Sequence, residues 1–129
     1  MTRSRTSARQ AGTRFETLIA DGLAWLLKDD RIERRSRNGA KDRGDIAGLR
    51  SPHGERIVIE CKDVAKLNLG GWLNEAEVEA GNDDAPIALV IHKRRGKGEA
   101  LDQYVTMTVR SFVRLGWAAE ATSLENRSE

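Results

Sequence analysis

The sequence predicts an α/β (α+β) fold in which a mixed central sheet is flanked by helices. Three segments carry this prediction. Residues 12–28 repeat apolar side chains at a three-to-four-residue spacing, which is the pattern of an amphipathic helix. Ile57-Val58-Ile59 opens a β-branched strand over 57–62 that follows a turn. Residues 87–91 form a continuous apolar run, which is typical of a strand buried on both faces.

The remaining elements are predicted from shorter patterns of apolar spacing, turn residues and glycine. We expect strands over 32–37, 45–50 and 104–108, helices over 72–81 and 111–116, turns at Asn38-Gly39 and 51–54, and a chain break at Gly70-Gly71. The expected order is therefore α-β-β-β-α-β-β-α without an internal repeat, which corresponds to one mixed sheet with helices on its faces.

Length and composition limit the class of protein. The 129 residues suffice for one domain, expected over 11–118, between a flexible basic arm at 1–10 and a disordered tail at 119–129. No apolar run approaches the ~20 residues that span a bilayer, and no signal peptide is evident. The single cysteine, Cys61, excludes an internal disulfide and suits a reducing compartment. We therefore expect a cytoplasmic protein without a membrane partner.

Basic side chains gather in two runs, although the net charge is only +2. Binding to a phosphate backbone requires such runs, and solvated loops are the alternative interpretation. The residues expected to contact DNA are Arg34, Arg35, Arg37, Lys41, Arg43, Lys93, Arg94 and Arg95.

Two charged side chains stand at the end of the apolar strand 57–62. Because side chains alternate along a strand, Glu60 and Lys62 share one face, while Ile57, Ile59 and Cys61 share the other. A carboxylate and an ammonium group at the end of a buried strand carry a desolvation cost. That cost favours a functional pair over the alternative, a simple salt bridge at the strand end.

Two further acids could complete a site around this pair. Asp45 starts the preceding strand, and a hairpin through 51–54 would bring it beside Glu60; a turn-capping aspartate is the alternative. Glu16 lies at the border of the apolar arc of the first helix, where it could reach the same point or be solvated. Oxygen ligands that converge in this way suit Mg²⁺ or Mn²⁺.

These residues resemble a known family of nucleases. Asp45 followed by Glu60-Cys61-Lys62 resembles the Asp…Glu-X-Lys core of the PD-(D/E)XK nucleases. Glu16 on the preceding helix resembles the branch that contains the archaeal and phage Holliday junction resolvases. The residue before the first motif acid is Gly44, where the motif's name places a proline that is often absent in the superfamily.

Two further stretches, residues 38–46 and 72–76, are similar to small resolvase-type nucleases of actinobacteria and their phages. The resemblance spans roughly residues 9–112. It implies a restriction-endonuclease-like αβββαβ core, and a location in a bacterial or phage-infected host cytoplasm.

The resemblance also implies metal-dependent hydrolysis of a DNA phosphodiester. Its catalytic residues would be Glu16, Asp45, Glu60 and Lys62, and its metal ligands Asp45, Glu60, Glu16 and the Cys61 backbone carbonyl. A Mg²⁺ (or Mn²⁺) ion would polarise the phosphate and lower the pKa of a bound water. Lys62 would orient that water and stabilise the developing charge. The side chain of Cys61 is expected to be only a small core residue.

The function we expect is that of a structure-selective Holliday junction resolvase. It would act as a homodimer on a four-way junction, because two symmetric cuts require two active sites. The alternatives are a less selective nickase or restriction-repair nuclease of the same fold, and a non-catalytic DNA-binding module. The presence of all four site residues favours an enzyme. Trp72 is expected in the core or an interface, with stacking on DNA as the alternative.

Overall fold

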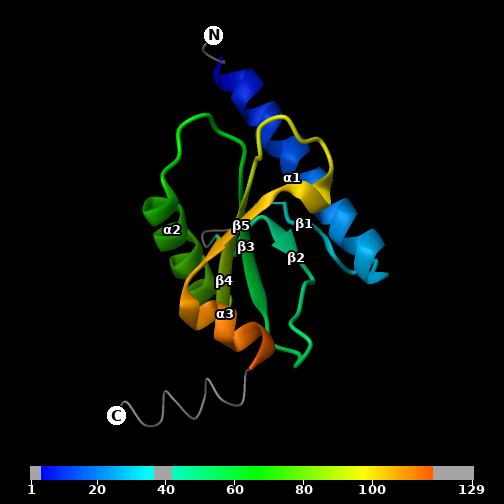
Figure 1. The fold of residues 1–129 in the computed structure, drawn as a ribbon, viewed down its shortest axis with the longest axis vertical. Helices are drawn as coiled ribbons and strands as arrows, with labels where there is room; N and C mark the ends of the chain where they lie inside the picture. The colour runs from blue at the N-terminus through cyan, green and yellow to red at the C-terminus, as the bar shows by residue number, and fades with distance from the viewer. Residues whose placement is uncertain (1–3, 37–41, 118–129) are drawn as a thin grey trace.

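The computed structural model describes residues 4–36 and 42–117, and shows an α+β arrangement around one sheet (Figure 1). The expected turn at Asn38-Gly39 and the expected tail at 119–129 lie outside the described residues. The elements in chain order are α1 (Arg5–Leu27), β1 (Glu33–Arg34), β2 (Ile46–Ala47), β3 (Ile57–Lys62), α2 (Leu69–Asn82), β4 (Ile87–His92), the 3-10 helix η1 (Ala100–Asp102), β5 (Tyr104–Met107) and α3 (Val109–Gly116).

The sheet is mixed, as predicted, and its strand order is β1-β2-β3-β4-β5. Only β3 and β4 run parallel, in a register that pairs Ile57 with Ile87 and Lys62 with His92. The other neighbouring strands are antiparallel. Helix α2 connects the parallel pair, because two parallel strands need a crossover connection. The carboxyl ends of β3 and β4 therefore meet at one edge of the sheet.

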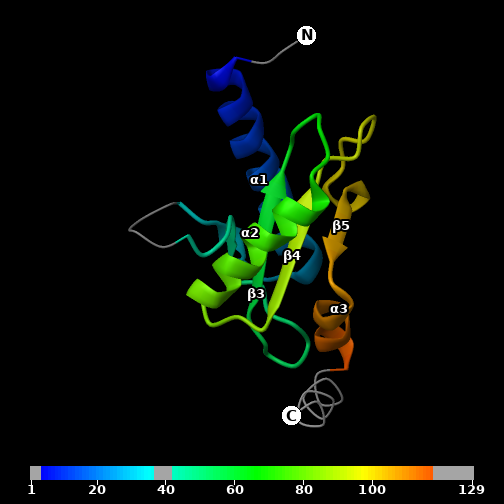
Figure 2. The same ribbon diagram turned by 90° about the vertical axis from the view of Figure 1, so that its left-hand side faces the viewer.

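Helices α1 and α2 cover opposite faces of the sheet, and Figure 2 looks onto the α2 face. Ile59 of β3 packs with Phe15 and Ile19 of α1 in one core cluster. Val58, its neighbour on the strand, packs with Trp72 of α2 in the other cluster. The predicted alternation of side chains along β3 is thus confirmed, and it directs Glu60 and Lys62 toward α2.

The N-terminal helix begins earlier than the apolar periodicity predicts. The hydroxyl of Ser4 accepts a hydrogen bond from the Ser7 backbone N–H and caps a helix that starts at Arg5. Within the described residues, 5–10 are therefore helical, where a flexible arm was expected. A solvent-facing turn needs no apolar residue, so the periodicity could not reveal it.

Helix α2 also starts before its predicted position. Asn68 accepts a hydrogen bond from the Gly71 backbone N–H, so Gly70 and Gly71 lie in the first turn and do not break the chain. Strands β1 and β2 are shorter than expected, with two residues each. Beyond β2, Arg50 pairs with Arg56 in an isolated antiparallel bridge.

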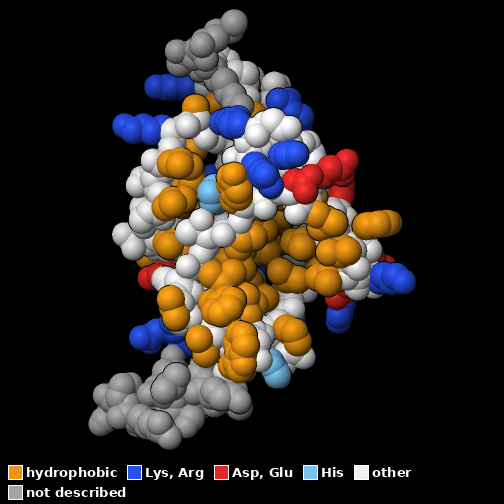
Figure 3. Space-filling view, in the orientation of Figure 1, with side chains coloured by type: hydrophobic (Ala, Val, Ile, Leu, Met, Phe, Trp, Pro, Cys, Tyr) orange, Lys and Arg blue, Asp and Glu red, His pale blue; other side chains and the backbone are white. Residues whose placement is uncertain are grey.

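The α1 face of the sheet is only partly covered (Figure 3). Apolar side chains, among them Leu27, Ile91, Val105 and Met107, line a hollow of about 600 Å³ between α1, β5 and the chain after β2. Val105 is 50% exposed. A large contiguous apolar patch of this kind is typical of a surface that binds another molecule. None of the described helices has the length and apolar character to cross a lipid bilayer.

Gly48→Ala is expected to destabilise the domain by about 3 kcal/mol. Gly48 has φ +92°, and an added Cβ would overlap the backbone carbonyl of Arg31. The control is Gly54→Ala, at φ +84° with open space around the added atom, which should cost only about 1 kcal/mol. Urea unfolding at pH 7 measures both values, and equal losses would contradict the proposed backbone overlap.

Candidate active site

Asp45 is held against β3 by two backbone contacts. Its N–H donates to the Ile59 carbonyl over 2.8 Å, and its Oδ2 accepts from the Cys61 N–H over 2.8 Å. Gly44 precedes it at φ +94°, and an added Cβ there would lie 3.0 Å from the Ile59 oxygen. Only glycine fits this close approach easily. The hairpin thus brings Asp45 beside the strand that carries Glu60, as predicted.

Glu60 and Lys62 lie on the α2 side of the sheet. Glu60 is 6% exposed, and its Oε2 has no hydrogen-bonding partner among the described residues. Lys62 Nζ lies 3.5 Å from Glu60 Oε1 and 3.0 Å from Glu75 Oε2 of α2. One ammonium group therefore bridges a buried carboxylate and a half-exposed one, so the pair is more than an isolated salt bridge.

The pKa of Lys62 lies above its ordinary value. Burial acts to lower this pKa, but hydrogen bonding and attraction to Glu75 and Glu60 outweigh it. The ammonium is therefore fully charged at neutral pH. A charged lysine can stabilise an anion or orient a water, but it cannot act as a general base.

Burial and the charge of Glu60 raise the pKa of Asp45 to about 7, although the Cys61 N–H acts to lower it. Glu16 and Asp42 raise this pKa further. In the metal-free protein near neutral pH, the Asp45 carboxyl is therefore partly protonated and releases its proton readily. A carboxylate of this kind is suited to exchange its proton for a cation.

Glu16 approaches the same region from α1. Its Oε1 lies 3.8 Å from Arg34 Nε, and its side chain is 16% exposed. Its charge contributes to the raised pKa of Asp45, which places the two acids within electrostatic range. Glu16 is thus largely shielded from solvent and lies within electrostatic range of the site. Across the described ranges 4–36 and 42–117, no three histidine, cysteine, aspartate or glutamate side chains form a ready-made metal shell.

Glu79 of α2 is a buried acid that the sequence analysis missed. It is 6% exposed and lies on the Glu60 side of the sheet, and its Oε2 lacks a partner among the described residues. Burial, followed by hydrogen bonding and repulsion from Glu60 and Asp42, raises the pKa of Glu79 to about 10. The signal was present in the sequence, because Glu79 occupies the same helical stripe as Trp72, Ala76 and Ala80.

The second basic run borders the end of β3. Lys93 N–H donates to the Lys62 carbonyl over 3.0 Å, and Arg95 Nη1 lies 3.4 Å from Asp63 Oδ1. The guanidinium of Arg94 lies 5.4 Å from the centre of the Tyr104 ring. The Lys93 ammonium itself contacts the Lys97 carbonyl, so all three basic side chains of this loop lie beside the strand end that carries Lys62 but are engaged within the protein.

The first basic run is divided among several environments. Arg34 faces Glu16, and Arg35 Nη2 lies 3.8 Å from Asp83 Oδ2. Arg43 is exposed. Arg37 and Lys41 lie outside the described residues. The sequence could locate the run but could not show that Arg34 and Arg35 turn toward acids of the protein.

Burial decides between the alternative interpretations of Trp72 and of the Cys61 side chain. Trp72 is 5% exposed and packs with Ala76 and Val90, 5.5 Å from the His92 ring, so it belongs to the core. Cys61 packs against the α1-side core. Burial, aided by the charge of Asp45, raises the pKa of its thiol, which keeps the thiol protonated and unreactive.

The structure thus brings Asp45, Glu60 and Lys62 together at one strand end, with Glu16 nearby and Glu79 added. Comparison with known protein families, with curated proteins and with solved structures finds no match to this chain. The functional interpretation therefore rests on the chemistry of these side chains.

Proposed function

We propose that this protein is a metal-dependent DNA endonuclease of the PD-(D/E)XK type, acting as a structure-selective Holliday junction resolvase. The observation that carries the proposal is the hydrogen bond from the Cys61 N–H to Asp45 Oδ2. It aligns an acid of one strand with Glu60 and Lys62 of the next. The order α1-β1-β2-β3-α2-β4 is compatible with a restriction-endonuclease-like core, and this finer assignment is part of the proposal.

The donor chemistry of the site suits a hard divalent cation. Asp45, Glu60 and the Cys61 carbonyl would hold Mg²⁺ or Mn²⁺, with Glu16 completing or tuning the shell. The burial of Glu60 beside the equally buried Glu79 supports this fit, because two carboxylates in contact need a shared proton or a cation between them. When bound, the ion would polarise the phosphate and acidify a water.

The protein's own side chains would stabilise charge, orient the water and contact the DNA backbone. Lys62, held by Glu75, would place its ammonium against the negative charge that develops on the phosphate. Asp45 and Glu60 would orient the reacting water through the shell they form. The loop Lys93, Arg94 and Arg95, with Arg34 and Arg43, would follow the DNA backbone and fix its position without reading its sequence.

Two symmetric cuts in a junction require two such sites, so the proposed enzyme is a homodimer. The hollow apolar face between α1 and β5 is the surface that a second copy would cover, because its exposed side chains include Leu27 and Val105. Burial of this face would remove apolar area from water at about 25 cal/mol per Å².

Val105→Asp is expected to shift the protein from dimer to monomer. A carboxylate at the centre of a buried apolar interface has no partner, so the substitution should raise the dimer dissociation constant at least about 100-fold. Sedimentation and light scattering over a concentration series measure it. The control is Val78→Asp, at an exposed valine of α2 on the other face of the sheet. A monomeric wild type, or equal effects of the two substitutions, would remove this face from the proposal.

The proposed function is tested with labelled four-way junction, linear duplex and single-stranded DNA, each in Mg²⁺, Mn²⁺ or EDTA. Paired nicks in the junction that require the metal support the resolvase. Equal cleavage of all substrates indicates a less selective nuclease of the same kind. Tight binding without cleavage in any metal contradicts the enzyme and leaves a DNA-binding module.

A further inference from the structure

A second polar site lies at the opposite end of β3 from Lys62. It is a pocket of about 280 Å³ in which the charged side chains are four arginines and one aspartate. The residues that line it are Arg35, Arg43, Gly48, Leu49, Arg50, Arg56, Ile57 and Asp83. Counted over the described residues, the formal charge of this lining is +3. An excess of positive charge of this size in one small pocket favours the binding of an anion.

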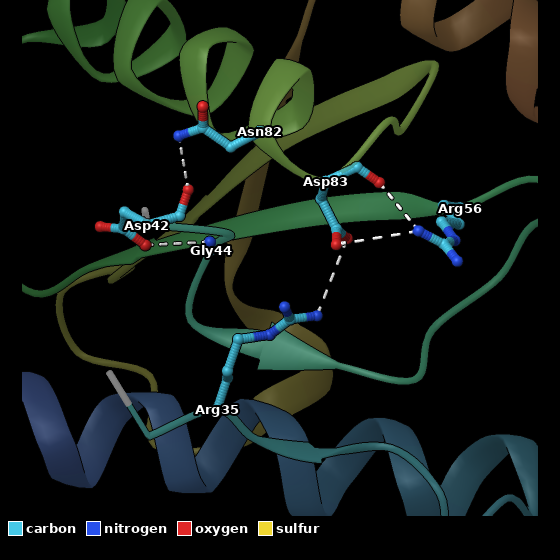
Figure 4. A network of polar contacts seen from close by, with 6 residues as sticks. All are labelled: Arg35, Asp42, Gly44, Arg56, Asn82 and Asp83. Atoms are coloured by element: carbon cyan, nitrogen blue, oxygen red, sulfur yellow. Dashed lines mark hydrogen bonds and ion pairs between the residues drawn. The ribbon is translucent and has the colours of Figure 1, made fainter. Parts of the chain in front are cut away.

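The carboxylate of Asp83, the single acid among the described lining residues, makes no direct hydrogen bond to the arginines around it, although Arg56 Nη1 donates to the Asp83 backbone carbonyl over 3.0 Å. Asp83 lies at the end of α2 and faces both Arg35 and Arg56 (Figure 4). Its carboxylate oxygens are 3.8 Å from Arg35 Nη2 and 3.9 Å from Arg56 Nη1. Both distances exceed those of a direct hydrogen bond. Arg35 Nε is buried and has no hydrogen-bonding partner among the described residues.

Two of the arginines are forced together by the backbone. Arg50 and Arg56 are direct partners in the isolated antiparallel bridge, where like charges are destabilising. The loop between them is fixed by Ser51, whose Oγ accepts from the N–H groups of His53 and Glu55. The backbones of the two arginines are therefore held side by side, while the Arg50 guanidinium donates to the Gly54 carbonyl over 3.2 Å and the Arg56 guanidinium to the Asp83 carbonyl over 3.0 Å. Their repulsion would be relieved by an anion that accepts hydrogen bonds from both.

The pocket lies close to the candidate active site, and two backbone segments connect them. Ile57 lines the pocket and precedes Glu60 by three residues, or about 10 Å along the strand. The Arg35 N–H donates to the Asp45 carbonyl over 2.8 Å. A rise of 3.4 Å per nucleotide makes this separation about three base steps. An anion in the pocket and a reacting phosphate could belong to one DNA strand.

We propose that the pocket binds a backbone phosphate of the DNA about three nucleotides from the scissile phosphate, which sets the register of the strand at the cut. This proposal rests on the proposed nuclease function. The guanidinium groups would donate pairs of hydrogen bonds to the phosphate oxygens, as arginine does at phosphate sites. Asp83 holds Arg35 and Arg56 in place and limits the affinity.

The test measures junction binding in EDTA, so that no cleavage is needed. The Arg50→Gln/Arg56→Gln double variant should raise the dissociation constant about 10-fold and reduce the slope of log K against log salt by about 0.9, the loss of one phosphate contact. Arg5→Gln/Arg9→Gln on α1, two exposed arginines, is the matched control for lost charge. Asp83→Asn should tighten binding several-fold, which a purely structural role for the aspartate does not predict. Thermal unfolding verifies that each variant is folded.

A second arm uses inorganic phosphate alone. It should raise the melting temperature of the wild type but not of the double variant. Phosphate stabilisation with unaltered DNA binding would overturn the proposal and leave a site for a free anion. Equal effects of the arginine pair and the α1 control on DNA binding would also overturn the phosphate proposal. In that case, junction cleavage by the wild type would still support the proposed function. A wild-type protein that binds no DNA would contradict both the phosphate pocket and the proposed nuclease function.

Discussion

Lys62→Met is expected to lower the rate of Mg²⁺-dependent junction cleavage by about 10²–10³-fold, while the affinity for the junction stays within about threefold. Methionine keeps the length of the side chain but removes the charge that would face the phosphate. The raised pKa of Lys62 means that the wild type carries this charge throughout the neutral range. Single-turnover cleavage, with binding measured in Ca²⁺, separates the two quantities.

Glu75→Gln is the companion variant, because it removes the charge that lies 3.0 Å from Lys62 Nζ but leaves the ammonium in place. It should slow cleavage only about 10-fold. Lys66→Met, at an exposed lysine of the loop after β3, is the control for lost charge near the site. Full activity of Lys62→Met would remove Lys62 from the proposed chemistry and weaken the assignment to the PD-(D/E)XK type.

Asp45→Asn is expected to stabilise the metal-free protein at pH 8 by roughly 10–20 °C in melting temperature. The folded-state pKa of Asp45 is raised from 3.8 to about 7, so the folded protein favours the protonated acid. Its contribution to stability is complete below about pH 4 and is lost as the pH rises toward 7, at about 1.4 kcal/mol per pKa unit. Asparagine removes that loss and can still accept the Cys61 N–H.

The measurement is thermal unfolding in EDTA between pH 5 and pH 8, repeated with Mg²⁺. The advantage of Asp45→Asn should shrink toward pH 5, and Mg²⁺ at pH 8 should stabilise the wild type more than the variant. Glu79→Gln is the matched control. Because its pKa of about 10 leaves Glu79 neutral at pH 8, the neutral amide should change the melting temperature little. A wild-type melting temperature that is flat from pH 5 to 8 would contradict the prediction for Asp45.

These two predictions together describe a site whose acids lower the stability of the metal-free protein and favour the binding of a cation. The part-buried Asp45 and the buried Glu79 both lie close to the buried Glu60, and burial together with this crowding raises the pKa of Asp45 and of Glu79. A fold optimised only for stability would place apolar side chains there. The acids are therefore better explained by a ligand that stabilises their ionised form, and a hard cation is the ligand proposed here.

The sequence by itself determined the elements with strong periodicity. β3 spans 57–62 as predicted, because three β-branched residues follow a turn, and β4 differs from its prediction by one residue. Alternation along β3 was enough to place Glu60 and Lys62 on one face. It also predicted that a hairpin would bring Asp45 to that strand. The starts of α1 and α2 were missed because Ser4 and Asn68 cap polar turns that carry no apolar signal.

Only the tertiary structure decided which charges meet. Glu79 reaches the candidate site because α2 crosses over the face of β3, and Glu75 meets Lys62 for the same reason. Arg35 and Arg56 are distant in the sequence and come together on Asp83 through the packing of α2 against the β2–β3 hairpin. Sequence spacing specifies neighbours within one element, where geometry repeats. Contacts between elements depend on how the core packs, and that is where this protein's buried acids and its arginine pocket arise.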